Sequence, residues 1–122
     1  MNTQEVANKW VDMCRQGQNL QAINELYADD VVSKEMPGMP DGLHTGIKEV
    51  YKKSEDWLAN VAEFHGGDIS DPIVAGSFFT TKKSFDVTFK DRGRQQMEEV
   101  CVFGVKNGKI ASEQFFYDMP EM

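Results

Sequence analysis

The sequence predicts an α+β fold, an α+β cone or barrel in which three N-terminal helices pack in the concavity of a strongly curved, mostly antiparallel mixed sheet. Apolar residues recur at helical spacing through the first half of the chain, and after Val61 the apolar period changes to two. Tight-turn signals separate the later strands, the strongest being Asn107-Gly108. No repeat or linker interrupts the 122 residues, so we expect a single domain over residues 1–122.

The helices are predicted from apolar stripes and from the residues at their ends. The first is expected from about Thr3 to Gln16, with Gly17 where a left-handed C-cap belongs. A shorter second helix begins near Asn19, which we interpret as its N-cap, and ends at Asp29-Asp30. The third carries its apolar residues on one face from Ile47 to Val61. The first two helices should pack as a hairpin.

The strands are predicted from alternation of side chains. Val31-Val32 begins a short strand, and the Gly- and Pro-rich residues 36–42 form a loop. A long alternating stretch over residues 79–89 is followed by a hairpin turn and a strand from about Gln95 to Val105. The last strand follows Asn107-Gly108 and covers Lys109 to Asp118.

Composition narrows the classes of partner. The chain has 20 acidic and 13 basic side chains, a formal net charge of −7, which argues against nucleic acid as a partner. No stretch approaches the length of a membrane span, and the first residues lack the pattern of a secretion signal. We therefore expect a cytoplasmic chain with no membrane partner.

Cysteine and histidine usage predicts neither disulfides nor metal. Cys14 and Cys101 form no spaced framework, so we expect reduced, buried thiols. The residues that could ligate zinc, these two with His44 and His65, are scattered over most of the chain. No metal and no cofactor is expected.

Several segments resemble the SnoaL-like family of the nuclear transport factor 2-like superfamily, whose fold is a cystatin-like α+β cone. Each segment alone is weakly specific, but their order and spacing match nearly the whole chain. They are Leu26–Val32, His44–Gly46, Met97–Phe103, Gly108–Ile110 and Glu113–Tyr117.

The resemblance implies a shape more than an activity. The fold includes ketosteroid isomerases, polyketide cyclases, dehydratases, epoxide hydrolases and non-catalytic binding domains, and many members dimerise through the sheet. Aligned with the steroid isomerases, the general base falls near Glu35, the oxyanion-binding phenol at Trp10, and the protonated acid near Cys101. Indole N–H and thiol S–H groups are not a strong oxyanion hole, so steroid isomerase activity is disfavoured.

Glu99 is the leading candidate for catalysis. Strand alternation places it on an apolar face with Met97, Cys101 and Phe103. If this face lines the concave interior, burial raises the pKa of the carboxyl and makes Glu99 a candidate general acid or base. The alternatives are a carboxylate paired structurally with a basic side chain, or one left in water at the mouth of the cone.

His44 and Glu35 are the candidate catalytic partners of Glu99. His44 follows the Gly/Pro-rich loop and has a pKa that ordinarily lies near neutrality. Glu35 is a carboxylate that a pocket would desolvate. The alternatives are an exposed loop histidine and a solvated carboxylate at a strand edge.

Further residues are expected to contact a ligand, although core packing is the usual fate of aromatic side chains. On the last strand, Glu113 and Tyr117 share a face with Phe115, and alternation alone leaves open which face is concave. The predicted ligand-binding residues are Trp10, Tyr51, Trp57, Phe79, Phe85, Cys101 and Tyr117.

These observations predict a protein that binds a small, largely apolar molecule in a cone-shaped cavity. Any catalysis would be cofactor-independent acid/base chemistry of the isomerase, cyclase or dehydratase type. The alternative is a non-catalytic ligand-binding or dimerisation module. We expect a homodimer through the sheet face, because Val100 and Val102 lie together on the outward side of their strand.

Overall fold

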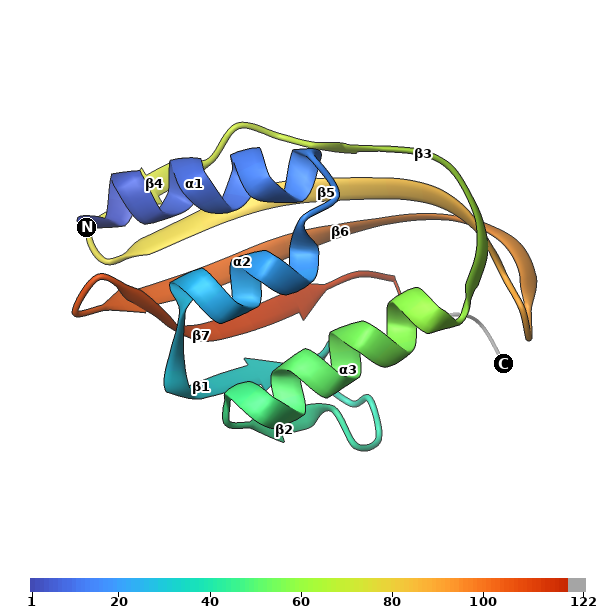
Figure 1. Cartoon of the computed structure of the whole chain (residues 1–122), viewed down its shortest axis with the longest axis horizontal. Coiled ribbons are helices and arrows are strands. Elements are labelled where there is room, and N and C mark those ends of the chain that lie inside the picture. The colour runs from blue at the N-terminus through green and yellow to red at the C-terminus, as the bar shows by residue number, and fades with distance from the viewer. Residues whose placement is uncertain (119–122) are drawn as a thin grey trace.

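The computed structural model describes residues 1–118, which form three helices and an open seven-stranded sheet (Figure 1). The strand order is β2-β1-β7-β6-β5-β3, and β4 also pairs with β5. Pairing is antiparallel except between β1 and β7. The elements are α1 (Thr3–Arg15), α2 (Asn19–Leu26), β1 (Tyr27–Lys34), β2 (Leu43–Thr45), α3 (Ile47–Ala59), β3 (Val61–Ile69), β4 (Ile73–Ala75), β5 (Phe78–Phe89), β6 (Gly93–Lys106) and β7 (Lys109–Phe116).

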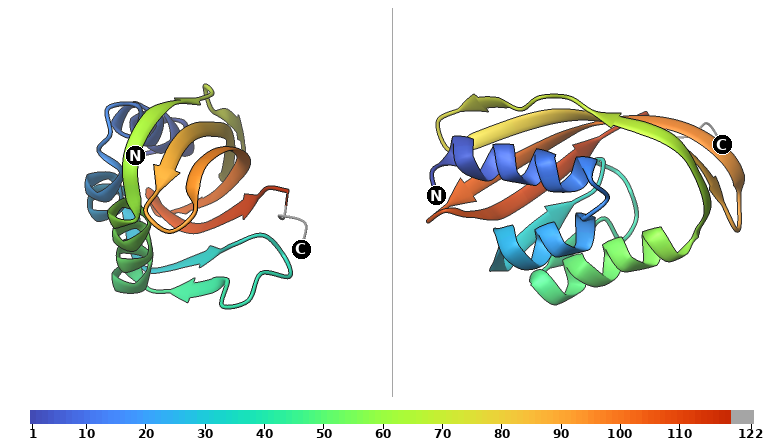
Figure 2. Two further views of the ribbon diagram at one scale, coloured as in Figure 1. Left: turned by 90° about the vertical axis from the view of Figure 1, so that its right-hand side faces the viewer. Right: turned by 45° about the horizontal axis from the view of Figure 1, so that its top comes forward.

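The sheet curls around the helices without closing. Figure 2 shows the three helices on its concave side, with the long strands β5 and β6 bending strongly toward their hairpin. The predicted α+β class and mixed, mostly antiparallel sheet are confirmed, but β2 and β3 remain free edges, so the sheet is not a closed barrel. None of the helices in residues 1–118 has the length and apolar character to cross a bilayer.

Helix α1 has well-defined ends. The Asn2 side chain accepts a hydrogen bond from the Glu5 backbone N–H, while the Glu5 side chain accepts one from the Asn2 N–H. Gly17 has a φ of 77°, which confirms the predicted left-handed position after the helix.

Two predicted boundaries of the second helix are wrong. Asn19 is the first helical residue, not the N-cap, and the preceding Gln18 makes no side-chain cap. The helix ends at Leu26, and Asp29 and Asp30 lie within β1. The reason is long-range, because Tyr27 already pairs with Ile110 of the parallel strand β7.

The later strands follow the predicted alternation closely. Asn107 and Gly108 have φ values of 53° and 76°, as their hairpin turn requires. The third helix stops at Ala59, and Val61 begins β3 rather than ending the helix. The three-residue strands β2 and β4 are too short to give a sequence signal, and both take their conformation from a longer partner strand.

The core lies between α1 and the inner face of β5 and β6. Trp10, Phe79 and Phe103 form its centre, with Phe79 and Phe103 stacked at 4.6 Å between ring centroids and Trp10 at 4.6 Å from Phe103. A second cluster forms where the sheet bends. There the Trp57 ring meets Phe85 and Phe89 edge-on, at 5.2 and 5.5 Å.

Truncation of Phe103 tests how much this core contributes to the free energy of unfolding. Phe103→Ala removes a fully buried ring from two aromatic contacts and is expected to lower the free energy of unfolding by about 3 to 5 kcal/mol. Ile73→Ala is the control, because Ile73 on β4 is 70% exposed, and should cost less than about 1 kcal/mol. Urea unfolding followed by circular dichroism measures both, and equal losses would contradict this account of the core.

Candidate functional site

Four polar residues face the helices from the middle of β5 and β6. Thr81 pairs with Cys101 across the two strands, and Lys83 pairs with Glu99. Residues directly opposite in an antiparallel pair share one face, and Thr81 and Cys101 are buried there. We call Thr81, Lys83, Glu99 and Cys101 the inner quartet. Strand alternation therefore places Glu99 on the inner face, which is the condition on which its candidacy as an acid or base depends.

A pocket of about 450 Å³ opens beside the inner quartet, of which Lys83 lines it and Thr81, Glu99 and Cys101 do not. It lies between the end of α1, the start of α2, the end of α3, and strands β3 and β5, and Lys83 forms part of its wall. Most of the wall is apolar. The lining residues are Cys14, Arg15, Gly17, Asn19, Trp57, Leu58, Val61, Phe64, Gly67, Asp68, Ile69, Lys83, Ser84 and Phe85.

Glu99 is half-buried and poorly solvated. Burial raises the pKa of its carboxyl, and the Lys83 charge on the neighbouring strand opposes that rise. Its one hydrogen-bond donor among the described residues is the Cys101 thiol, with Sγ 3.6 Å from the carboxylate oxygen. A thiol is a weak donor, so the carboxylate retains nearly all of its capacity to accept a proton.

A second polar cluster centres on Lys53 of α3. Its Nζ lies 2.9 Å from Ser33 Oγ, 2.9 Å from Glu35 Oε1 and 3.9 Å from Glu113 Oε2. Ser33 donates to Glu113 at 2.7 Å, and the Tyr27 hydroxyl donates to the other oxygen of Glu113. We call these five residues the Lys53 cluster. It joins α3 to β1 and β7.

Tyr117 extends the Lys53 cluster past the end of β7. Its hydroxyl donates to Glu35 Oε2 at 2.9 Å, and burial together with this bond raises the pKa of Tyr117 to about 12. Both oxygens of Glu35 are thereby occupied, one by Lys53 and one by Tyr117. Of the inner carboxylates Glu35, Glu99 and Glu113, Glu99 alone accepts no hydrogen bond from an N–H or O–H group of residues 1–118.

The two cysteines remain neutral thiols near pH 7. Burial raises the pKa of Cys14 to about 11 and the pKa of Cys101 further, the latter also because of the Glu99 charge. Both are free cysteines, and no group of three or more His, Cys, Asp or Glu in the described residues is arranged to hold a metal ion.

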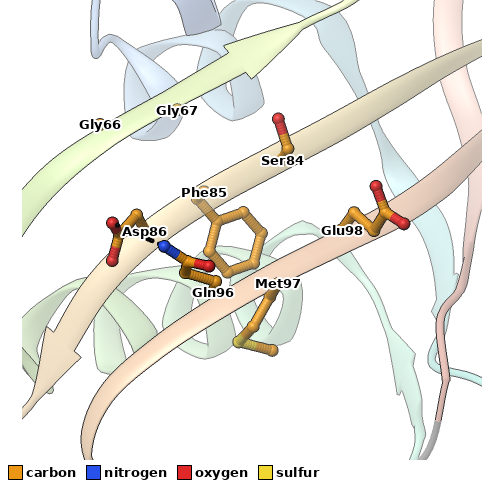
Figure 3. A pocket seen from close by; sticks show the side chains of 8 residues that line it. All are labelled: Gly66, Gly67, Ser84, Phe85, Asp86, Gln96, Met97 and Glu98. Atoms are coloured by element: carbon orange, nitrogen blue, oxygen red, sulfur yellow. Dashed lines mark hydrogen bonds between the residues drawn. The ribbon is translucent and has the colours of Figure 1, made fainter.

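A second hollow, about 570 Å³, lies at the bend of β5 and β6 (Figure 3). Its charged groups are already paired, since Arg94 binds both oxygens of Asp86 at 3.0 and 2.8 Å and lowers the pKa of Asp86 to about 2. Glu98 pairs with Lys82 at 3.2 Å. The pocket beside the inner quartet is therefore the stronger candidate site.

Comparison with known proteins agrees with this architecture. The SnoaL-like domain family matches residues 1–117. A SnoaL-like polyketide cyclase candidate from Mesorhizobium loti is 38% identical, with a TM-score of 0.90 over 96% of this chain and 100% of its own. The chain belongs to the SnoaL-like family.

Two more distant structures share the fold of this SnoaL-like chain. A Xanthomonas campestris protein of unknown function with a cystatin-like fold is 18% identical, with a TM-score of 0.79 over 98% of this chain and 92% of its own. An M. tuberculosis LEH-like epoxide hydrolase is 17% identical, with a TM-score of 0.70 over 95% and 82% of the two chains. No curated protein matches the sequence.

Some of the predicted site residues surround the pocket of this SnoaL-like domain. Trp57 and Phe85 line it, whereas Cys101 and Tyr117 lie outside its lining and contact Glu99 and Glu35, which do not line it either. Glu35 is held by Lys53, which satisfies its charge.

Other predicted residues lie elsewhere. Trp10 and Phe79 are in the hydrophobic core, because the side chains of α1 and β5 interdigitate there, and Tyr51 packs half-buried against it. His44 pairs with Ser33 across β1 and β2 and so shares the Ser33 face, but it makes no side-chain hydrogen bond to another described residue.

The sequence reasoning did not single out Lys83, Lys53, Ser33 or Tyr27 for the site. The sequence does contain a signal for Lys83. It lies on the same face of its strand as Phe79 and Phe85, and a charged residue on an apolar strand face is unusual. Lys53 similarly follows Val50 by three residues on the buried side of α3.

Removal of the Lys53 ammonium should strongly destabilise the fold. Lys53→Met leaves the carboxylates of Glu35 and Glu113 without their cation, and Glu113 is 5% exposed, so we expect a loss of about 2 kcal/mol or more. Lys52→Met is the matched control, because Lys52 lies on the solvent side and pairs only with Asp56. Urea unfolding at pH 7 should show a lower midpoint for Lys53→Met alone, and equal midpoints would refute the role of the cluster.

Proposed function

We propose that this protein binds a small, largely apolar molecule in the pocket beside the inner quartet and catalyses cofactor-independent proton transfer on it. Isomerisation, cyclisation and dehydration belong to this class. Glu99 is the general acid and base. The names of two fold relatives, a cyclase candidate and an epoxide hydrolase, support chemistry on small organic molecules.

The observation that carries the proposal is the availability of Glu99. General-base catalysis requires a carboxylate that is not already neutralised by strong donors and whose pKa approaches the working pH. Glu35 and Glu113 accept strong hydrogen bonds and adjoin Lys53. Glu99 accepts only a thiol hydrogen bond, and burial raises its pKa.

The pocket wall favours an apolar body in the ligand. Trp57 and Phe85 supply aromatic surface, and Leu58 and Phe64, which are 39% and 63% exposed, extend the apolar surface along the pocket. Burial of ligand carbon against such surface yields about 25 cal/mol per Å². His44 remains a predicted catalytic partner of Glu99. Glu35 and Tyr117 would contribute by holding Lys53 in position.

Glu99→Gln tests the catalytic assignment. With 3-cyclohexenone as probe, the wild type should accelerate conversion to the conjugated 2-cyclohexenone, followed by ultraviolet absorbance. Glu99→Gln should lose about 100-fold or more of that rate, as is typical when a general base is removed. Glu98→Gln is the matched control, since Glu98 lies on the outer face beside Lys82, and should retain the wild-type rate. Full turnover by Glu99→Gln would remove Glu99 from the mechanism.

The burial of Glu99 predicts how both the rate and the stability of the protein change with pH. The base works when ionised, so the wild-type rate should rise with pH through an apparent pKa above the ordinary 4.5 of glutamate. Because burial favours the protonated form in the folded state, the stability contribution of Glu99 is present at low pH and is lost as pH rises through its raised pKa. Glu99→Gln should therefore unfold at a higher temperature than the wild type at pH 7. A lower melting temperature would contradict the burial argument.

We also propose a homodimer formed through the outer face of β5, β6 and β7. Phe78, Val100 and Phe116 are exposed by 57%, 45% and 37%, and the strand registers place them on the face opposite to the buried residues Phe79, Cys101 and Phe103. Lys82 and Glu98 border the patch and carry opposite charges. A two-fold interface brings the same patch from both copies together, and a face with both charges is complementary to itself.

Val100→Asp should break this dimer. A carboxylate in the middle of the buried patch would be desolvated in the interface but hydrated in the monomer. Sedimentation velocity should show wild-type dimer and Val100→Asp monomer. Leu43→Asp, at an apolar position on β2 that is 61% exposed, should remain dimeric. A monomeric wild type at high concentration would overturn the proposal.

A further inference from the structure

We infer that the ligand of the 450 Å³ pocket is a monocarboxylate with an apolar body, and that Lys83 in the pocket wall binds its carboxylate. The ligand occupies the pocket named in the proposed function, on which the inference rests. It narrows that ligand from a largely apolar molecule to an amphipathic anion. The catalytic role of Glu99 is a separate matter, and the two can be tested apart.

The Lys83 ammonium lies between the sheet and the helices. The strand registers pair Lys83 with Ile69, which is 6% exposed, and with Glu99 on the other side. Burial raises the pKa of the Cys14 and Cys101 thiols, and the Lys83 charge opposes both rises. These thiols belong to α1 and β6, so the ammonium is close enough to act on groups of both elements.

The donors of Lys83 are free to bind a ligand. Within residues 1–118 its ammonium forms no ion pair and no hydrogen bond, and it lies 5.9 Å from the centre of the Phe85 ring. Lys53 is the contrast, since its ammonium lies 2.9 Å from an oxygen of Ser33 and 2.9 Å from one of Glu35. An ammonium in a pocket wall attracts an anion and can donate hydrogen bonds to it.

The other charged residues of the pocket wall do not neutralise Lys83. Arg15 donates hydrogen bonds to the Ile69 carbonyl and to Asp71. Asp68 directly precedes Ile69 on β3, and Ile69 is the residue that pairs with Lys83, so alternation directs the Asp68 side chain to the other face of the sheet. Lys83 therefore supplies the uncommitted charge on the inner side of the wall.

Glu99 leaves room for a ligand anion at Lys83. It is the cross-strand neighbour of Lys83, but it does not line the pocket and forms no ion pair with Lys83. Burial raises the pKa of the Glu99 carboxyl, which lowers the share of its charged form at a given pH. The pocket side of the ammonium is thus open to a second carboxylate.

Apolar side chains form most of the remaining wall and suit the body of such a ligand. Trp57 meets Phe85 edge-on at 5.2 Å, and Leu58 and Phe64 are 39% and 63% exposed along the pocket. A ligand chain or ring lying against these four residues removes their apolar surface from water. The volume of about 450 Å³ is ordinary for a small-molecule site.

The charge of the wall selects a carboxylate among possible head groups. One ammonium balances a single negative charge, whereas phosphate dianions are ordinarily held by several cations or by a series of backbone N–H groups. A cationic head group would be repelled by Lys83, and a neutral one would form weaker hydrogen bonds with it. A monocarboxylate matches the site in both charge and hydrogen-bond acceptors.

Displacement of a neutral dye tests the head group directly. N-phenyl-1-naphthylamine fluoresces in apolar surroundings, and decanoate and 1-decanol have the same chain length with different head groups. At pH 7 the wild-type chain should bind the dye. Decanoate should displace it at a concentration about tenfold or more below that of decanol, because a charged acceptor binds the ammonium more strongly than a hydroxyl does.

Lys83 variants test which residue provides the preference. Lys83→Met should lower the affinity for decanoate about tenfold or more and leave the affinity for decanol unchanged, whereas Lys83→Arg keeps the cation and should keep the preference. Lys82→Met is the matched control, because Lys82 pairs with Glu98 on the outer face, and should behave as the wild type. Circular dichroism checks that each variant is folded.

Trp57 reports where the ligand binds. It lines the pocket, whereas the other tryptophan, Trp10, is 5% exposed in the core. Decanoate should change the tryptophan emission of the wild type, and Trp57→Phe should remove most of that change. An equal change in Trp57→Phe would place the ligand elsewhere and overturn the inference.

The remaining outcomes separate the carboxylate site from the proposed catalysis. Equal displacement by decanoate and decanol, or an unchanged preference in Lys83→Met, overturns the carboxylate site. If Glu99→Gln nevertheless loses its turnover of 3-cyclohexenone, the proposed function stands without that site. A preference for decanoate that depends on Lys83, together with full turnover by Glu99→Gln, supports the carboxylate site and rejects Glu99.

Discussion

The ion pair between Lys53 and the carboxylates of Glu35 and Glu113 is the interaction on which the interior depends. It crosses from α3 to β1 and β7, so it fixes the helix over the concave face of the sheet. Breaking a buried pair costs far more than its formation yields, which makes this junction specific as well as stable. It also occupies the carboxylate oxygens of Glu35 and Glu113, and leaves the Glu99 carboxylate available to accept a proton.

Glu99 is free to accept a proton because of where the other polar groups lie. The charges of Glu35 and Lys53 in the Lys53 cluster act on the pKa of Glu99, but among residues 1–118 the only hydrogen bond to Glu99 comes from the Cys101 thiol. A desolvated carboxylate at Glu99 and an unpaired hydroxyl at Thr81 each lower the stability of the free protein. Groups of this kind persist in folded proteins at functional sites, where a ligand satisfies them.

Local patterns in the sequence predicted much of the fold. Helical stripes, the positive φ of Gly17, the Asn107-Gly108 hairpin and the shared face of Glu99 and Cys101 all follow from spacing alone, but which face of that strand is concave does not. The end of the second helix did not, because Tyr27 is drawn into β1 by pairing with β7, over 80 residues away. The Lys53 cluster could not be predicted from the sequence either, because it joins one helix to two strands. Trp10 and Phe79 show the same limit, because one sequence pattern describes a pocket wall and a packed core.

The ionisation of Glu99 is the most direct measure of this account. Carbon-13 NMR of the glutamate side-chain carboxyls, assigned by comparison with Glu99→Gln, follows its titration in the intact chain. The account predicts a pKa for Glu99 above the ordinary 4.5, rising further when the Lys83 charge is removed in Lys83→Met. Titration at or below 4.5, without response to Lys83, would show a hydrated carboxylate and contradict it.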